Sequence, residues 1–158
     1  MEHLYTPWRS DYIHGKTPQE GCFFCLHQKS KNDEENLVLF RGDTSFVLLN
    51  LYPYTDGHLL IAPYRHIAQP NDLSKEEWIE IHELARRGIA ALEKVSHPEG
   101  FNLGMNLGRV AGAGVVGHLH LHVVPRWNGD TNFMPILAQT KMINENLHTV
   151  YKKLKSAF

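Results

Sequence analysis

The sequence predicts an α+β domain: an antiparallel five-stranded sheet with a long crossover helix and a C-terminal helix. Short runs rich in β-branched and aromatic residues, separated by turn residues, indicate the strands. Two later segments place apolar residues at three- and four-residue steps, which is typical of amphipathic helices. The chain has 158 residues, 42% of them hydrophobic, which suffices for one ordinary core. We therefore expect a single domain over 1–158, with an N-terminal arm (1–36), a core (37–125) and a C-terminal extension (126–158).

The first three strands are expected in three short runs of β-forming residues: 37–40, 45–50 and 58–62. Arg41-Gly42-Asp43-Thr44 supplies turn residues for a hairpin between the first two. Pro53-Tyr54-Thr55-Asp56-Gly57 forms a second turn, and Pro63 ends the third strand. Residues 1–36 carry no such pattern and are expected to be irregular.

A long helix is expected from Ser74 to His97, because six apolar residues share one face: Trp78, Ile81, Ala85, Ile89, Leu92 and Val95. Ser74 with Glu77 is a capping-box signature at its start, and His97-Pro98 ends it. A last helix is expected from about Lys141, where four apolar residues again share a face: Ile143, Leu147, Val150 and Leu154.

Two further strands, 101–106 and 118–124, are joined by a glycine-rich loop. In the second, His118-Leu119-His120-Leu121-His122 alternates strictly, so the three histidines project from one face. Adjacent imidazoles on such a strand lie about 6.5 to 7 Å apart. Neutral imidazole is both a nucleophile and a metal ligand, so this row can surround a phosphorus atom or bind a metal. The plain alternative is a strand with a polar outer face.

The composition of the chain limits the classes of partner that we expect. The formal charge is -1, so we expect no nucleic acid and no membrane surface as a partner. The start of the chain, Met1-Glu2-His3-Leu4-Tyr5, lacks a basic segment followed by an apolar run, and we expect a cytoplasmic protein. Cys22 and Cys25 lie three apart, which in a reducing compartment indicates metal or redox use more than a disulfide.

The histidine segment resembles the motif of the histidine triad superfamily, His-φ-His-φ-His-φ-φ with φ apolar, and Pro125-Arg126 continues it as in many members. The resemblance extends to Asn50, to Asp56-Gly57-His58 and to Asn106 with the glycine-rich loop. Further stretches resemble the bacterial diadenosine tetraphosphate phosphorylase branch: Pro7-Trp8-Arg9, Tyr12-Ile13, 106–109 and 125–133.

The resemblance implies a catalytic set. His120 would attack the α-phosphorus of an adenosine nucleotide, forming a nucleotidyl-histidine that inorganic phosphate or water resolves. His122 and His58 would orient His120 and fix its tautomer, and His118 belongs to the same set. Two-step transfer suits imidazole, which is nucleophilic without prior deprotonation.

The resemblance also implies substrate contacts. Asn50 and Asn106 match positions that contact ribose and phosphate. Phe46 and Leu48 would line the base pocket, with ordinary core as the equal alternative. Amides of the loop that includes Gly112-Ala113-Gly114-Val115 can approach phosphate oxygens, since few side chains intervene; a flexible connection is the alternative. Relatives often carry Gln, Ser or Thr where this chain has Ala113-Gly114-Val115, which leaves backbone amides or water to bind the phosphate.

The cysteine pair is half of a zinc site by spacing. In zinc-binding members of the superfamily the other ligands match His66 and His118. Cys22, Cys25, His66 and His118 would then form a closed, structural site, and zinc at His118 would prevent that residue from donating a proton to the leaving group.

The expected activity is cleavage of diadenosine tetraphosphate with phosphate to give ADP and ATP. The alternatives are hydrolysis of diadenosine polyphosphates or of nucleoside phosphoramidates, and a zinc-stabilised nucleotide-sensing module with little turnover. The family usually forms homodimers, so a homodimer is expected.

Overall fold

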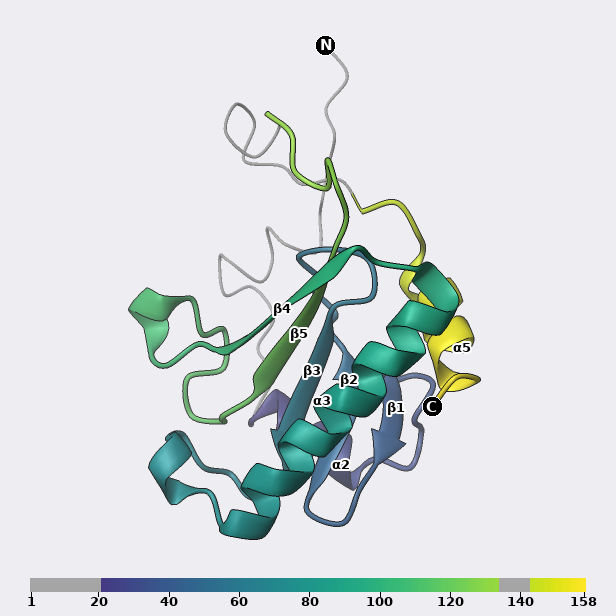
Figure 1. Ribbon diagram of the computed structural model, residues 1–158. Coiled ribbons are helices and arrows are strands. Elements are labelled where there is room, and N and C mark those ends of the chain that lie inside the picture. The colour runs from purple at the N-terminus through teal and green to yellow at the C-terminus, as the bar shows by residue number, and fades with distance from the viewer. Residues whose placement is uncertain (1–20, 134–142) are drawn as a thin grey trace.

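The computed structural model describes residues 21–133 and 143–158. Its centre is the expected five-stranded antiparallel sheet, in the order β1-β2-β3-β5-β4 (Figure 1). The strands are β1 (Val38–Arg41), β2 (Ser45–Leu49), β3 (Leu59–Pro63), β4 (Gly100–Met105) and β5 (Leu121–Arg126).

Helices cover both faces of this sheet. In Figure 1, α3 (Lys75–Ser96) crosses the front face and α2 (Phe23–Lys29) lies behind it, while α5 (Leu147–Lys155) lies beside β1. Two short 3-10 turns complete the described elements, η1 (Pro70–Asp72) and η2 (Arg109–Ala111). No helix in the described ranges is long and apolar enough to cross a membrane.

The alternation of side chains along the strands divides the core into two clusters. Leu59 and Ile61 of β3 belong to the large cluster under α3 and α5. Leu60 and Ala62, one residue away, belong to a smaller cluster with Phe24 of α2. The sheet therefore has an α3 face and an α2 face, and a side chain's parity along the strand decides which helix it meets.

The long helix forms as predicted, except that one residue of its predicted apolar face is exposed. The Oγ of Ser74 accepts the amide of Glu77, and the Glu77 carboxylate accepts the amide of Ser74. Trp78, however, is 46% exposed. The buried face includes Gly88 instead, where an added Cβ would lie 2.7 Å from a methyl group of Leu59. Glycine lets the helix axis approach the sheet at this point.

Two predictions about helices are wrong, and the strand expected over 118–124 begins only at Leu121. Residues 1–36 are not irregular throughout, because Phe23–Lys29 is the helix α2; residues 1–20 lie outside the described part. The last helix begins at Leu147, with Asn146 accepting the amide of His148 as its N-cap, and 143–146 is not helical. Lys141 itself lies outside the described residues.

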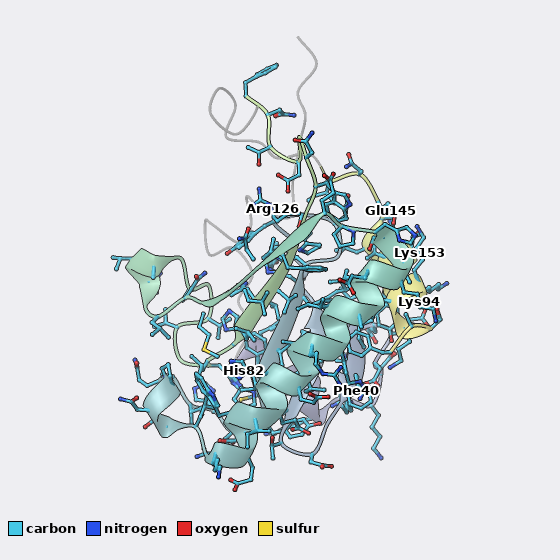
Figure 2. All side chains as sticks on the ribbon, in the orientation of Figure 1. Phe40, His82, Lys94, Arg126, Glu145 and Lys153 are labelled. Atoms are coloured by element: carbon cyan, nitrogen blue, oxygen red, sulfur yellow. The ribbon has the colours of Figure 1, made fainter. Side chains whose placement is uncertain are left out.

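The helix α5 protects the exposed edge of β1. The Tyr151 hydroxyl donates to the carbonyl of Val38 (3.2 Å), and the Lys155 ammonium donates to that of Leu39 (3.0 Å). The ion pair between Lys153 and Glu145, both labelled in Figure 2, lies on its exposed side. Unpaired edge carbonyls invite pairing with other chains, and here side-chain donors occupy them.

The β1–β2 turn is held by a carboxylate from α3. Glu80 accepts the amides of Asp43 (2.7 Å) and Thr44 (2.6 Å) and the hydroxyl of Thr44. This couples the first hairpin to the long helix across the α3 face.

We expect Glu80→Ala to lower the free energy of unfolding by about 2 kcal/mol, since it strands donors of a partly buried turn. Chemical denaturation measures this. Glu83→Ala is the control: Glu83 lies on the same helix and forms an ion pair with Arg86 in which both side chains are exposed, so its loss costs about 0.5 kcal/mol or less. Equal losses for the two variants would contradict the turn-holding role.

Candidate functional site

The three histidines lie where the chain enters β5, on the α2 face of the sheet. His118 and His120 precede the hydrogen-bonded strand, which begins at Leu121, and all three side chains are buried. The ring centroids of His120 and His122 are 4.8 Å apart, closer than the 6.5 to 7 Å predicted for a regular strand. The rings lean toward each other because His120 is outside the regular ladder.

A fixed donor sets the proton positions on His58 and His122. The amide of Tyr54 donates to Nδ1 of His58 (3.1 Å), so in the neutral ring the proton of His58 is on Nε2. That nitrogen lies 2.9 Å from Nδ1 of His122, which accepts. The proton of neutral His122 is therefore on Nε2, a buried atom with no partner among the described residues.

His120 has the opposite tautomer. Its Nδ1 lies 2.8 Å from the carbonyl oxygen of His118, which can only accept, so Nδ1 carries the proton. The Nε2 lone pair is left unprotonated. The hydrogen bond that fixes the tautomer of His120 is therefore made by the backbone carbonyl of His118. The resemblance had implied that His122 and His58 would do this.

Burial keeps these rings neutral. Desolvation lowers the pKa of His118 and His120, and it lowers the pKa of His122 to about 4, with the neighbouring His120 as a lesser cause. At neutral pH each ring carries one proton. The site can therefore present one nucleophilic nitrogen, on His120, and one N–H donor, on His122.

A second cluster adjoins the first through His118. The ligand atoms of Cys22, Cys25, His66 and His118 all lie within 4.8 Å of one another. The Nε2–H of His118 donates to the carbonyl of Pro63 (2.9 Å), which leaves the lone pair of Nδ1 directed at the sulfurs. The structure brings together the four residues that the sequence assigned to a metal site.

The distances fit a tetrahedral ion. The Sγ atom of Cys22 lies 3.3 Å from Nδ1 of His118, and Sγ of Cys25 lies 3.4 Å from Nδ1 of His66 and 3.6 Å from that of His118. A tetrahedral zinc ion with ordinary bond lengths places sulfur and nitrogen ligands about 3.6 Å apart. Burial and the neighbouring Cys22 raise the pKa of the Cys25 thiol, an effect that a bound divalent cation reverses.

Phe24 connects the two clusters. It lies between the two cysteines on α2, is 1% exposed, and contacts the rings of His118 and His120 at centroid distances of 5.0 and 4.8 Å. Phe24 is not among the residues that the sequence patterns predicted, although its position between Cys22 and Cys25 was a signal that it lies beside the metal site.

Two predicted base-pocket residues have no exposed surface. Phe46 and Leu48 are 0% exposed and pack with Phe24 in the α2-face cluster, which is the core alternative. Asn50 lies in the histidine cluster, with Nδ2 3.2 Å from Nδ1 of His58 and Oδ1 accepting the amide of Tyr52.

The glycine-rich loop is partly committed to its own structure. The amide of Gly112 donates to Arg109 and that of Ala113 to Gly108, so these two are not free for phosphate, contrary to expectation. Gly112 takes a φ of +92°, and its Cα side lies against Nδ2 of half-buried Asn106. The amides of 114–117 have no partner within the described residues and stay available.

A cavity of about 530 Å³ lies away from the histidine cluster, at the C-terminal end of α3. Trp127 lines it, together with His97 and Lys153. None of the described histidines that form the triad or the cysteine cluster borders it, so it is separate from the site.

The Tyr54 amide and the Pro63 and His118 carbonyls are further functional groups that sequence reasoning missed. Each acts through its backbone, so no residue-type signal could identify it. The pairing of β3 with β5, with Leu60 opposite His122, brings the turn before β3 and the segment before β5 into one site.

Comparison with known proteins agrees with this geometry. A family model described as HIT domain matches residues 31–129. The chain is 39% identical to an AP-4-A phosphorylase of Mycobacterium tuberculosis, covering 98% of this chain and 83% of the relative. It is 34% identical to a bis(5'-adenosyl)-triphosphatase of Dictyostelium discoideum, over 56% of this chain and 59% of that protein.

A solved structure agrees as well. A zinc-bound histidine triad family protein from Mycobacterium smegmatis superimposes with a TM-score of 0.67 at 25% identity, over 87% of this chain and 92% of that one. The family model covers more than half of the chain, and the phosphorylase covers nearly all of it. The protein belongs to the HIT domain family.

Proposed function

We propose that the protein is an enzyme that cleaves diadenosine tetraphosphate with inorganic phosphate, giving ADP and ATP. The unprotonated Nε2 of His120 beside the unpaired Nε2–H of His122 carries the proposal. The 39% identity to an AP-4-A phosphorylase supports this substrate and acceptor.

In the first step Nε2 of His120 attacks the α-phosphorus that is attached to one adenosine of the substrate. The P–N bond forms, the bond to the bridging oxygen breaks, and ATP leaves with that oxygen. A neutral imidazole makes this attack without first losing a proton. The hydrogen bond from His120 Nδ1 to the His118 carbonyl (2.8 Å) holds the ring in the nucleophilic tautomer.

The His122 N–H stabilises the transferred group. A buried donor without a partner costs free energy in the empty site, and a phosphoryl oxygen placed beside His120 would satisfy it. The amides of 114–117, which have no partner among the described residues, offer further donors. Oriented dipoles of this kind stabilise charge that develops in the transition state.

In the second step phosphate attacks the same phosphorus, the P–N bond breaks, and ADP leaves. The support for phosphate as the acceptor is the 39% identity to an AP-4-A phosphorylase.

We expect His120→Ala to lower kcat/KM for diadenosine tetraphosphate by about 10³-fold or more, because the nucleophile is lost. Chromatography of the nucleotide products, with phosphate varied, measures it. The matched control is His148→Ala, an exposed histidine on α5, which should retain activity.

The products distinguish the alternatives. ADP plus ATP that require phosphate support the proposal, whereas AMP plus ATP without phosphate indicate a hydrolase. Turnover of adenosine phosphoramidate alone indicates a phosphoramidate hydrolase, and nucleotide binding without turnover indicates a sensing module. Full activity of His120→Ala contradicts the nucleophile assignment.

We also propose that Cys22, Cys25, His66 and His118 hold a structural zinc ion. The support is the tetrahedral spacing of sulfur and nitrogen atoms and the zinc-bound relative. Four protein ligands leave no open position, so zinc would fix α2 against the triad segment and supply no chemistry. Two reduced thiolates also suit a cytoplasmic location.

Elemental analysis of the purified protein should find about one zinc per chain. Cys25→Ser should lose the metal and lower Tm, because ligation contributes to folding. Ser30→Ala, just after α2, is the control and should keep the zinc. Less than about half an equivalent of zinc in protein with reduced thiols would reject the site.

We further propose a homodimer formed through the edge of β4. Within the described part of the chain this strand has a partner strand on one side only, and its Leu103 is 48% exposed. Light scattering should give twice the 18.1 kDa chain mass, and Leu103→Asp should shift it toward the monomer. A monomeric parent protein at micromolar concentration would contradict this.

A further inference from the structure

Tyr54 touches the His58–His122 pair in two independent ways. Its amide donates to Nδ1 of His58 (3.1 Å). Its ring lies parallel to that of His122, with planes 9° apart and centroids 5.7 Å apart, and it contacts the His58 ring at 4.5 Å. One residue of the turn before β3 therefore contacts both members of the pair.

The amide contact fixes the direction of the hydrogen bonds. A backbone N–H can only donate, so His58 must accept at Nδ1 and donate at Nε2. His122 then accepts at Nδ1 and keeps its proton on Nε2. If the hydrogen bonds ran in the opposite direction, Nε2 of His122 would present a lone pair, and not a proton, to the phosphoryl group.

The ring contact controls the plane and the solvent exposure of His122. Parallel aromatic rings at this separation attract each other in an offset arrangement. Tyr54 is itself half-buried, whereas His122 is 7% exposed. The tyrosine ring thus lies at the edge of the buried pair, where it excludes water.

We propose that Tyr54 is a positioning residue for the reaction: it orients the His122 N–H toward the transferred phosphoryl group and shields the His58–His122 pair from water. This inference rests on the proposed phosphoryl-group transfer. Tyr54 acts through the two histidines and need not touch substrate.

Removing the Tyr54 ring should have a kinetic signature. In Tyr54→Ala we expect kcat to fall about tenfold or more, because misplacing a donor weakens transition-state contacts. KM should change by about twofold or less, because ground-state binding does not depend on this orientation. Tyr54→Phe keeps the ring and the amide and should restore kcat.

The pH profile should move as well. Among the described residues, the titratable groups that face His122 are His58, His120 and Tyr54. Burial lowers the pKa of His122 to about 4, so admitting water in Tyr54→Ala should raise this pKa toward its ordinary 6.5. The pKa that describes the acid limb of the kcat/KM profile should rise with it.

Tyr64→Ala is the matched control. Tyr64 is also half-buried and stacked, but on Phe46, with planes 4° apart and centroids 5.5 Å apart. Its loss should cost stability to a similar extent while kcat and the pH profile stay unchanged. If both variants lower kcat equally at equal stability loss, Tyr54 is merely structural and the proposal is wrong.

Histidine ring ¹⁵N NMR of the full chain tests the inference without any substrate. The parent should titrate His122 near pH 4, and Tyr54→Ala should titrate it higher. An unchanged His122 titration overturns the positioning role. If the parent does not cleave diadenosine tetraphosphate, the proposed function fails, while this titration still decides the role of Tyr54. Tyr54→Leu replaces Tyr54→Ala if the latter fails to fold.

Discussion

Each of the three triad imidazoles carries a single proton at neutral pH, and the arrangement of the site follows from this constraint. Burial lowers the pKa of the three triad histidines, so each ring has one donor and one acceptor nitrogen. In each ring a backbone group determines which nitrogen carries the proton. The Pro63 carbonyl does so for His118, and the His118 carbonyl does so for His120. The Tyr54 amide does so for His122, acting through His58. The remaining nitrogens then differ in function. His118 directs a lone pair at the cysteines, His120 has a lone pair for attack, and His122 has an N–H for the phosphoryl group.

The packing of α2 makes this arrangement rigid. Phe24 presses on the rings of His118 and His120 from the sheet's α2 face. The guanidinium of Arg41 donates to the carbonyls of His27, Gln28 and Ser30 and pairs with Asp33, which holds the C-terminal end of the same short helix to β1. A helix of seven residues has little stability of its own. Its position therefore depends on these contacts, with the cysteine cluster at one end and Arg41 at the other.

Local patterns predicted much of this fold, and long-range contacts account for what they missed. Strict alternation placed the histidines opposite Leu121 and Val123, and the Ser74–Glu77 box marked the start of α3, because both depend on near neighbours in sequence. The helix α2 was missed, since it is held by Arg41 and Phe46 from distant strands. Trp78 was assigned to the apolar face because its spacing fits a helix, but its side chain is 46% exposed. The contact that the Tyr54 amide makes with His58 leaves no mark on the sequence, because every residue except proline carries such an N–H.

The electroneutrality of the site bears on how it handles a polyanion. The chain has a formal charge of -1, and the donors that the described residues offer to the proposed phosphoryl group are the Nε2–H of His122 and the backbone amides of 114–117, none of which is a cation. Full positive charges would attract all four phosphates of the substrate and both products alike. Oriented dipoles act over a short range, so they favour the one phosphoryl group held against His120 and leave the remaining phosphates weakly held. Such a site stabilises the transferred group in the transition state and releases a charged nucleotide readily.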